Sequence, residues 1–280
     1  MQEMKKDVPG FIKRVTISNN CTSDIILECV YCLSNTKAQS ANFPFCTIEP
    51  NHSIINVPDE RLAALEKIVN PERVIPATVE IVDIAGLVKG ASKGEGLGNK
   101  FLANIRETDA IIHVLRCFDN DNITHVDGSV NPLRDKEIID IELQLKDLES
   151  INNRLDKVNR TAKSGDKDAV QEKHILEKAV NLLESSNNIR SIEIDNEEKI
   201  KYLKPLQLIT DKPVLYVCNV DEGSVSTTND YVESVRSLIA KEDADLIILA
   251  AGIESEINEL ENYDERRMFL DDLGLDQPGS

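Results

Sequence analysis

The sequence predicts an α/β fold, a mostly parallel sheet with an antiparallel pair of helices inserted into it. Three observations indicate this fold class. Four short apolar runs are rich in β-branched residues and too short to be helices. Stretches of helical pattern separate them, as in parallel sheets whose strands are joined by crossover helices. One long segment breaks the alternation with apolar residues spaced three and four apart, which is typical of two packed helices.

The four apolar runs are the predicted strands of the sheet. They are Val79–Val82, Ile111–Leu115, Val214–Val217 and Leu246–Leu249, and Val15–Ile17 is a candidate for a first strand. Polar or small residues follow three of the four runs directly. Because ligands of parallel sheets bind beyond the carboxyl ends of the strands, we expect a nucleotide site at that edge.

The segment 133–202 is predicted to be a coiled-coil arm, inserted between two parts of a nucleotide-binding domain at 1–132 and 203–280. Two stripes and a turn at Ser164–Asp166 predict a helical hairpin. The first stripe is Ile141, Leu145, Leu148, Ile151, Leu155 and Val158, and the second is Ile175, Leu176, Ala179, Val180 and Leu183. The charged outer faces fit either a solvated structural arm or an arm that docks on a partner.

Composition argues against several classes of function. The net charge of -18 disfavours binding to nucleic acid backbone, which needs clustered Lys and Arg, and no sequence-specific contact with DNA is expected. Cys29 and Cys32 have C-x-x-C spacing, but no second pair or nearby His completes a zinc site. The Cys pattern suits a reducing cytosol. No apolar run reaches the length of a membrane span, so we expect a cytoplasmic protein without membrane contact.

The first chemical signal is an Asp at the end of a predicted strand. Asp83 and Gly86 have the order D-x-x-G, in which the Asp holds Mg²⁺ and the Gly N–H reaches a γ-phosphate. The pattern alone also fits an ordinary turn. A glycine-rich loop follows at Leu87–Phe101, and such a loop can change shape with the bound nucleotide. Upstream, Thr47 is a candidate Mg²⁺ ligand through its hydroxyl.

The residue after Gly86 is Leu87, where small GTPases have a Gln that orients the attacking water. An apolar side chain cannot do this, so hydrolysis needs another group. His125, in the polar loop Asp119–Asp127, is one candidate, and an ordinary loop histidine is the other interpretation of it.

The second chemical signal follows the third predicted strand. Asn219 and Glu222 have the order N-x-x-E, whereas a guanine-reading site has N-K-x-D. Val220 replaces the Lys and the longer Glu222 replaces the Asp, so the geometry for guanine is altered. The small residues after the next strand are expected to line the base pocket. They are Ala250, Ala251 and Gly252.

Four segments resemble the YchF-type Obg-like ATPases. They are NFPFCTIEPN at 42–51, the whole of 79–118, ITHVDGSVNP at 123–132, and NVDE at 219–222. The resemblance implies a Ras-like P-loop NTPase core, a coiled-coil arm and a C-terminal TGS domain that would begin near Gly279. It also implies Mg²⁺, ATP preferred over GTP, and the large ribosomal subunit as partner.

The resemblance also assigns roles to individual residues. Thr47 and Asp83 organise Mg²⁺, and the Gly86 amide meets the γ-phosphate. Asn219 and Glu222 frame the base. A His in the loop matching His125 takes part in positioning the attacking water.

The phosphate loop is where the sequence departs from the family. The family has G-L-P-N-V-G-K-S-T, but an ungapped alignment places NCTSDIILE there, at 20–28, with Ile26 for the Lys and Leu27 for the Ser. No G-x-x-x-x-G-K-[ST] occurs in the chain. Losing the Lys and the Ser removes charge-assisted bonds of roughly 1.5–3 kcal/mol each. Three hypotheses follow: a weakened hydrolase, a non-catalytic docking module acting through the arm, and a fragment without independent function.

Overall fold

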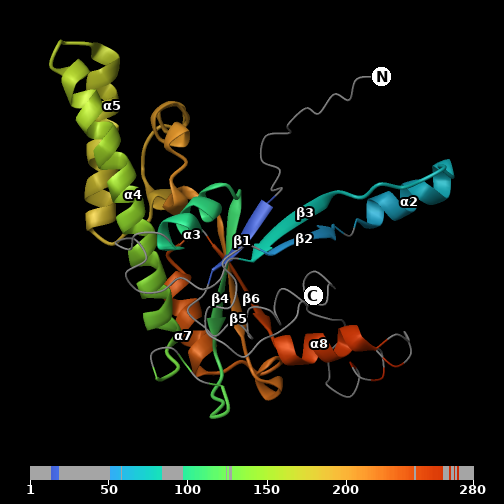
Figure 1. Ribbon diagram of the computed structural model, residues 1–280. Helices are drawn as coiled ribbons and strands as arrows, with labels where there is room; N and C mark the ends of the chain where they lie inside the picture. Colours follow the sequence, from blue (N-terminus) through green and yellow to red (C-terminus); the bar gives the residue numbers. More distant parts are fainter. Residues whose placement is uncertain are drawn as a thin grey trace.

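The computed structural model describes residues 14–18, 51–57, 59–83, 97–123, 125, 128–242, 244–260, 265, 268 and 270. Within them, six strands form one sheet in the order β2-β3-β1-β4-β5-β6 (Figure 1). The strands are β1 (Arg14–Ser18), β2 (Asn51–Asn56), β3 (Thr78–Asp83), β4 (Ala110–Arg116), β5 (Val214–Asn219) and β6 (Asp245–Leu249). Each predicted strand lies inside one of these, and the α/β fold class is confirmed.

The pairing is parallel except at one edge. β1 pairs in parallel with β3 and β4, and β4–β5 and β5–β6 continue the parallel order. β2 runs antiparallel to β3. The sequence analysis did not predict β2, whose segment NHSIIN lacks a long apolar run. An edge strand has only one neighbour, so it needs less apolar surface than a central strand.

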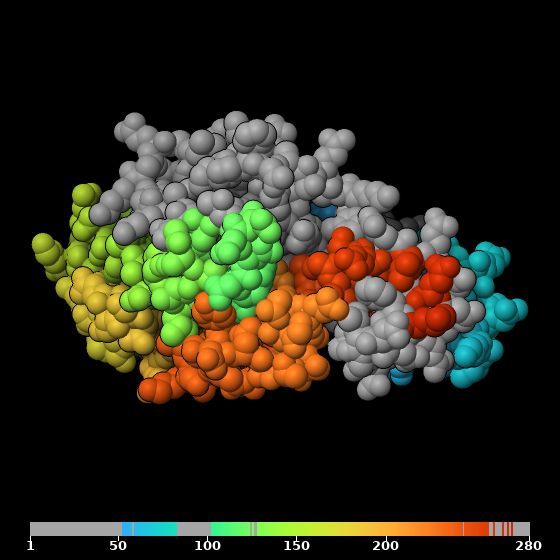
Figure 2. Space-filling view, turned by 90° about the horizontal axis from the view of Figure 1, so that it is seen from below, coloured from blue at the N-terminus to red at the C-terminus, as the bar shows by residue number. Residues whose placement is uncertain are grey.

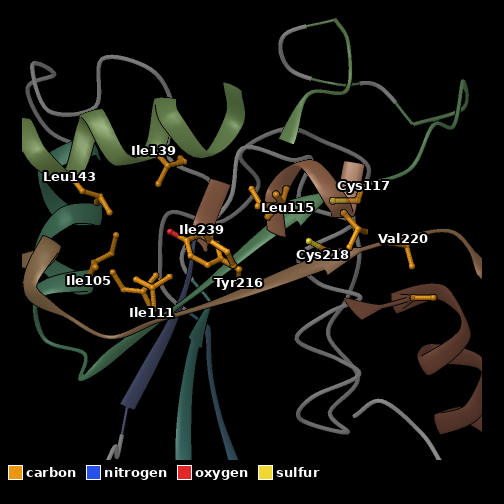
Figure 3. Close-up of a cluster of buried hydrophobic side chains, with 14 of the residues drawn as sticks. Ile105, Ile111, Leu115, Cys117, Ile139, Leu143, Tyr216, Cys218, Val220 and Ile239 are labelled. Carbon is orange, nitrogen blue, oxygen red and sulfur yellow. The ribbon is translucent and has the colours of Figure 1, made fainter. Parts of the chain in front are cut away.

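Both faces of the central strands are covered. All residues of β4 are buried, as expected for a strand with packed layers on both sides. Successive side chains alternate between the faces, so Ile111 and Leu115 join one core cluster while Ile112 and Val114 join the other. Figure 3 shows the larger cluster, in which Tyr216 of β5 is fully buried.

Four of the described helices supply apolar side chains to the larger cluster: α3 (Leu97–Arg106), α4 (Pro132–Ala162), α7 (Asp230–Ile239) and α8 (Ala251–Glu259). The other helices of the described chain are α2 (Glu60–Val69), α5 (Lys167–Glu184) and α6 (Asn196–Glu198). Short 3-10 and π turns complete them: η1 (Ile189–Ser191), η2 (Lys199–Leu203), η3 (Lys204–Leu206), η4 (Ile209–Asp211) and η5 (Glu222–Ser224).

The helical hairpin has clear start and stop signals. Asn131 caps α4 by accepting a hydrogen bond from the Arg134 N–H, and Pro132 follows at the first helical position. Gly165 has a φ of +85° in the turn between the helices, a conformation that favours glycine. Asp166 then caps α5 by accepting from the Ala169 N–H. The predicted turn at Ser164–Asp166 is therefore the observed one.

The arm formed by α4 and α5 has a core of its own. Ile151 and Val158 of α4 pack in one cluster with Ile175, Leu176 and Leu183 of α5. The returning segment covers the same cluster, because Ile189, Tyr202, Leu203 and Leu208 belong to it. Figure 1 shows this hairpin extending away from the sheet.

The predicted stripe on α4 is wrong at its start. Ile141 and Leu145 are exposed, while Ile139 and Leu143 are buried against the sheet. The first half of α4 packs on the core domain and the second half packs on α5. The buried stripe therefore rotates around the helix where its partner changes.

None of the helices that the structure describes is long and apolar enough to cross a membrane.

Candidate functional site

Asn219 ties three strand ends together at the carboxyl edge of the sheet. Its side chain is buried, and its Oδ1 accepts a hydrogen bond of 3.0 Å from the Ala251 N–H, the first residue of α8. Its carbonyl accepts from the Cys117 N–H at 2.8 Å. The next residue, Val220, donates its N–H to the Leu249 carbonyl at 2.9 Å. The ends of β4, β5 and β6 are thereby held in a fixed relation to the start of α8.

The residues predicted to frame a base lie on two neighbouring segments of this edge. Asn219 and Leu249 are register partners, so the residues after β5 and those after β6 emerge side by side. Val220, Ala250 and Ala251 are buried, whereas Glu222 and Gly252 are exposed. A side chain at Gly252 would meet open space. The structure thus places buried apolar residues next to an exposed glycine and an exposed carboxylate.

Figure 2 looks onto this edge. The segments after β4 (green), after β5 (orange) and α8 (red) lie next to one another on the surface. The loop after β4 is joined to α7 as well, because the Asn229 side chain donates to the Cys117 carbonyl at 2.7 Å. The same side chain caps α7 by accepting from the Val232 N–H.

The predicted phosphate side is described only in part. Asp83 is the last residue of β3 and the register partner of Ile17 in β1, so these two strands end side by side. The structure describes the backbone of Asp83 there. Thr47, Gly86 and the segment 20–28 lie outside the described residues.

A buried arginine holds the loop after β4. Arg116, the last residue of that strand, donates to the carbonyls of Phe118, Asn120 and Ile123 at 3.0, 3.1 and 3.0 Å. Its guanidinium also lies 4.8 Å from the centre of the Phe118 ring. A guanidinium carries five donors in a rigid plane, so it can fix several loop carbonyls at once. The sequence analysis missed this residue, since an Arg at the end of an apolar run carries no motif.

His125, the candidate for positioning water, is buried in the same loop. Its Nε2 lies 3.0 Å from Oδ2 of Asp135, and both side chains are only 3% exposed. Asp135 belongs to the first turn of α4, where an acidic residue ordinarily indicates only helix stabilisation. Its pairing with His125 depends on tertiary structure, so the sequence analysis did not find it.

A second polar cluster lies at the root of the arm. Lys136 of α4 is ion-paired with Asp140 at 2.6 Å and with Glu242 at 2.7 Å. Burial alone would lower the pKa of Lys136, but the Asp140 charge and the bonds to both carboxylates outweigh burial and raise it. A cavity of about 640 Å³ opens beside these residues, between α4, the segment after α5 and the end of α7. It is separate from the strand ends that hold Asn219.

Nearby, His113 of β4 is buried and its Nε2 has no hydrogen-bond partner within the described part of the chain. Burial, reinforced by the positive charges of Lys136 and Arg190, lowers the pKa of His113 to about 3. The imidazole is therefore neutral at physiological pH.

A mostly parallel sheet whose carboxyl edge gathers an Asp, an Asn and a helix start defines a Ras-like nucleotide-binding domain. The family model described as 50S ribosome-binding GTPase matches residues 29–150. "Ribosome-binding ATPase YchF" of Pasteurella multocida is 51% identical over 247 residues, which are 88% of this chain and 67% of the relative. The protein of that name in Bacillus subtilis is 50% identical over 249 residues, 88% of this chain and 68% of the relative.

The comparison with a solved structure agrees with these sequence similarities. The chain resembles the YchF GTPase of Schizosaccharomyces pombe with a TM-score of 0.76 and 31% identity, over 96% of this chain and 73% of that one. The chain belongs to the YchF family of Obg-like ATPases.

Proposed function

We propose that the chain binds a purine nucleoside triphosphate at the carboxyl edge of its sheet, ATP in preference to GTP. The observation that carries this proposal is the hydrogen bond from the Ala251 N–H to Asn219 Oδ1. It holds the loop after β6 against the loop after β5, which are the two walls of the expected base pocket. A buried side-chain acceptor used in this way preorganises a site before the ligand arrives.

The base would lie between these two loops. Val220 and Ala250 anchor these loops as buried apolar residues, and the exposed Glu222 offers a carboxylate acceptor for N–H groups of the base. Both adenine and guanine carry such donors. With Val220 in place of the Lys of a guanine-reading site, the pocket lacks one guanine-selective feature, which supports the preference for ATP.

The phosphates would extend toward the ends of β1 and β3. Asp83 and Thr47 supply a carboxylate and a hydroxyl, hard oxygen donors of the kind that Mg²⁺ prefers, and the Gly86 amide would meet the γ-phosphate. Bound Mg²⁺ would neutralise phosphate charge. The segment 20–28 has Ile26 and Leu27 where the Lys and Ser of a phosphate loop stand, so we expect weak binding and slow hydrolysis.

We further propose that the partner is the ribosome, on its large subunit, in the cytoplasm. The relatives named ribosome-binding ATPases support this. The arm at 133–202, inserted between the parts of the nucleotide domain at 1–132 and 203–280, would be one contact surface. A second candidate is a non-catalytic docking module, which the altered segment 20–28 favours; it predicts ribosome binding without hydrolysis.

The deciding experiment is titration of the folded chain with a fluorescent ATP analogue and Mg²⁺, followed by competition with ATP and GTP. We expect binding that ATP displaces at lower concentration than GTP. Asn219→Ala should weaken it by about tenfold or more, because the buried Ala251 N–H loses its acceptor, worth about 1–3 kcal/mol.

The matched control is Asn152→Ala, the same substitution at an exposed position of α4, which should bind as the parent chain does. Absence of binding up to millimolar nucleotide, in a sample shown to be folded, would exclude the ATPase. Co-sedimentation with ribosomes in that sample would then establish the docking module.

A further inference from the structure

His125 and Asp135 form a closed pair between the loop after β4 and the arm. The Nε2–Oδ2 distance is 3.0 Å, and solvent reaches 3% of each side chain. A carboxylate only accepts hydrogen bonds, so Asp135 Oδ2 accepts the hydrogen bond that His125 Nε2–H donates. This ring nitrogen is consequently occupied.

Asp135 is itself held on its other oxygen. Its Oδ1 accepts from Nε and Nη2 of Arg134 at 3.2 and 3.1 Å. Arg134 also reaches back to the loop, donating to the Ser129 carbonyl at 2.6 Å and to the Ser129 hydroxyl at 3.0 Å. The first turn of α4 thus holds the loop on both sides of Gly128.

The other end of the loop is fixed from the sheet by Arg116. His125 therefore lies between an anchor from a strand of the core and one from the first turn of α4, in the half of that helix that packs on the core domain. The core anchor comes from a strand buried on both faces and cannot shift without disturbing the core. The same 31-residue helix, α4, continues beyond this half into the arm, where Ile151 and Val158 pack with α5.

A water-positioning histidine has to present a ring nitrogen to the water. In this state His125 is covered and its Nε2 is bound to Asp135. We propose that Asp135 latches His125 in a withdrawn position, and that movement of the arm helix α4, on contact of the arm with a partner, releases it. The inference rests on the proposed function for the role of His125, but the latch itself does not require bound nucleotide.

The chain offers an internal set of probes, because it contains four histidines in all. His52 and His174 are exposed, whereas His113 and His125 are buried. Diethyl pyrocarbonate modifies accessible neutral imidazoles, and mass spectrometry assigns each adduct. At pH 7 we expect His125 to react at least about tenfold more slowly than His174, since it reacts only after local opening.

Asp135→Ala should release the ring and bring His125 to the rate of His174, and Asp135→Asn, which keeps one acceptor, should fall between. Asp156→Ala, at an exposed position of the same helix, is the control and should leave all four rates unchanged. His113 must stay protected in each variant, which distinguishes release of the latch from general loosening of the fold.

The arm's part is tested by adding ribosomes to the unchanged chain at saturating concentration. We expect His125 to gain reactivity while His113 does not. Equal rates for His125 and His174 without ribosomes, or protection of His125 in a folded Asp135→Ala, would overturn the latch. Bound ribosomes that leave His125 protected would overturn its release by the arm. Nucleotide is absent throughout, so failure of the proposed ATPase would appear in the titration and not here.

Discussion

The arm and the segment that runs from β2 through α2 to β3 both contain helices with apolar and charged residues. These helices differ in how many of their apolar side chains are buried. α5 buries Ile175, Leu176 and Leu183 against α4 and the returning segment. α2 buries none of its residues, and its Ile68 side chain is 79% exposed. Figure 1 shows α2 at the far end of β2 and β3, away from the sheet, on the side opposite to the arm.

This difference shows that an amphipathic pattern is necessary for packing but does not bury a helix by itself. The apolar face must also meet a second element of the structure. α2 has good local signals: Asp59 caps it by accepting from the Arg61 N–H, and Asn70 ends it in the left-handed conformation. Those signals determine where the helix begins and ends, but not what it packs against. In the arm, by contrast, the turn at Gly165 brings a second stripe against the first.

The largest effect is expected where the arm joins the core. Asp147 of α4 is fully buried and accepts from the N–H groups of Ile209 and Thr210 and from the Thr210 hydroxyl, at 2.7–2.9 Å. Asp147→Ala leaves these donors without an acceptor and should lower the free energy of unfolding by about 3–5 kcal/mol. Urea denaturation measures this. A loss below 1 kcal/mol would mean that the return segment is not held through Asp147.

The next effect concerns the arm's own core. Leu176 is fully buried between the helices, so Leu176→Ala removes transfer energy and leaves a cavity, at a cost of about 2–5 kcal/mol. Urea denaturation followed by far-UV circular dichroism checks it. If the arm unfolds separately from the sheet, the loss will appear in only one of two transitions.

The third effect concerns His113 of β4, close to where the arm joins the core, and it depends on pH. The pKa of His113 is about 3 in the folded chain and 6.5 when unfolded, so below pH 6.5 the unfolded state binds the extra proton. Stability is then present above pH 6.5 and falls as the pH drops toward 3, by up to about 1.4 kcal/mol per pH unit from this group.

Replacing the ring isolates this contribution. His113→Phe keeps an aromatic ring near Tyr216, whose centroid lies 5.6 Å away, and should flatten the pH dependence of unfolding between pH 6.5 and 5. The exposed His174→Gln should leave the slope as it is. An unchanged slope in His113→Phe would place the acid sensitivity elsewhere.

The smallest effect is expected on α2. Ile68→Ala removes a side chain that packs on little, so the free energy of unfolding should change by less than about 0.5 kcal/mol. Comparison with Leu176→Ala in the same denaturation assay gives the contrast between the two regions directly. A loss above about 1.5 kcal/mol would show that α2 is buried in solution, and would remove the contrast.

Sequence patterns predicted the central strands and the hairpin because those elements are selected by local periodicity. The runs of β4 and β5 are apolar almost throughout, a composition that is typical of strands covered on both faces. β2 was not predicted because an edge strand does not need a long apolar run. Ile141 and Leu145 were assigned to the wrong face because a spacing rule assumes one partner along a helix, whereas α4 has two.

The candidate site divides in the same way. The sequence by itself determined the fold class, the helical insertion and the residues at the strand ends, since Asp83 and Asn219 are identified by following apolar runs. Only the tertiary structure decided which groups these residues bind. Asn219 accepts a hydrogen bond from the Ala251 N–H, Arg116 donates to carbonyls of the loop after β4, and His125 pairs with Asp135. Those contacts join segments brought together by packing. A hydrogen bond between buried groups leaves no periodic trace in a sequence, because only the folded chain makes the two groups neighbours and removes water from them.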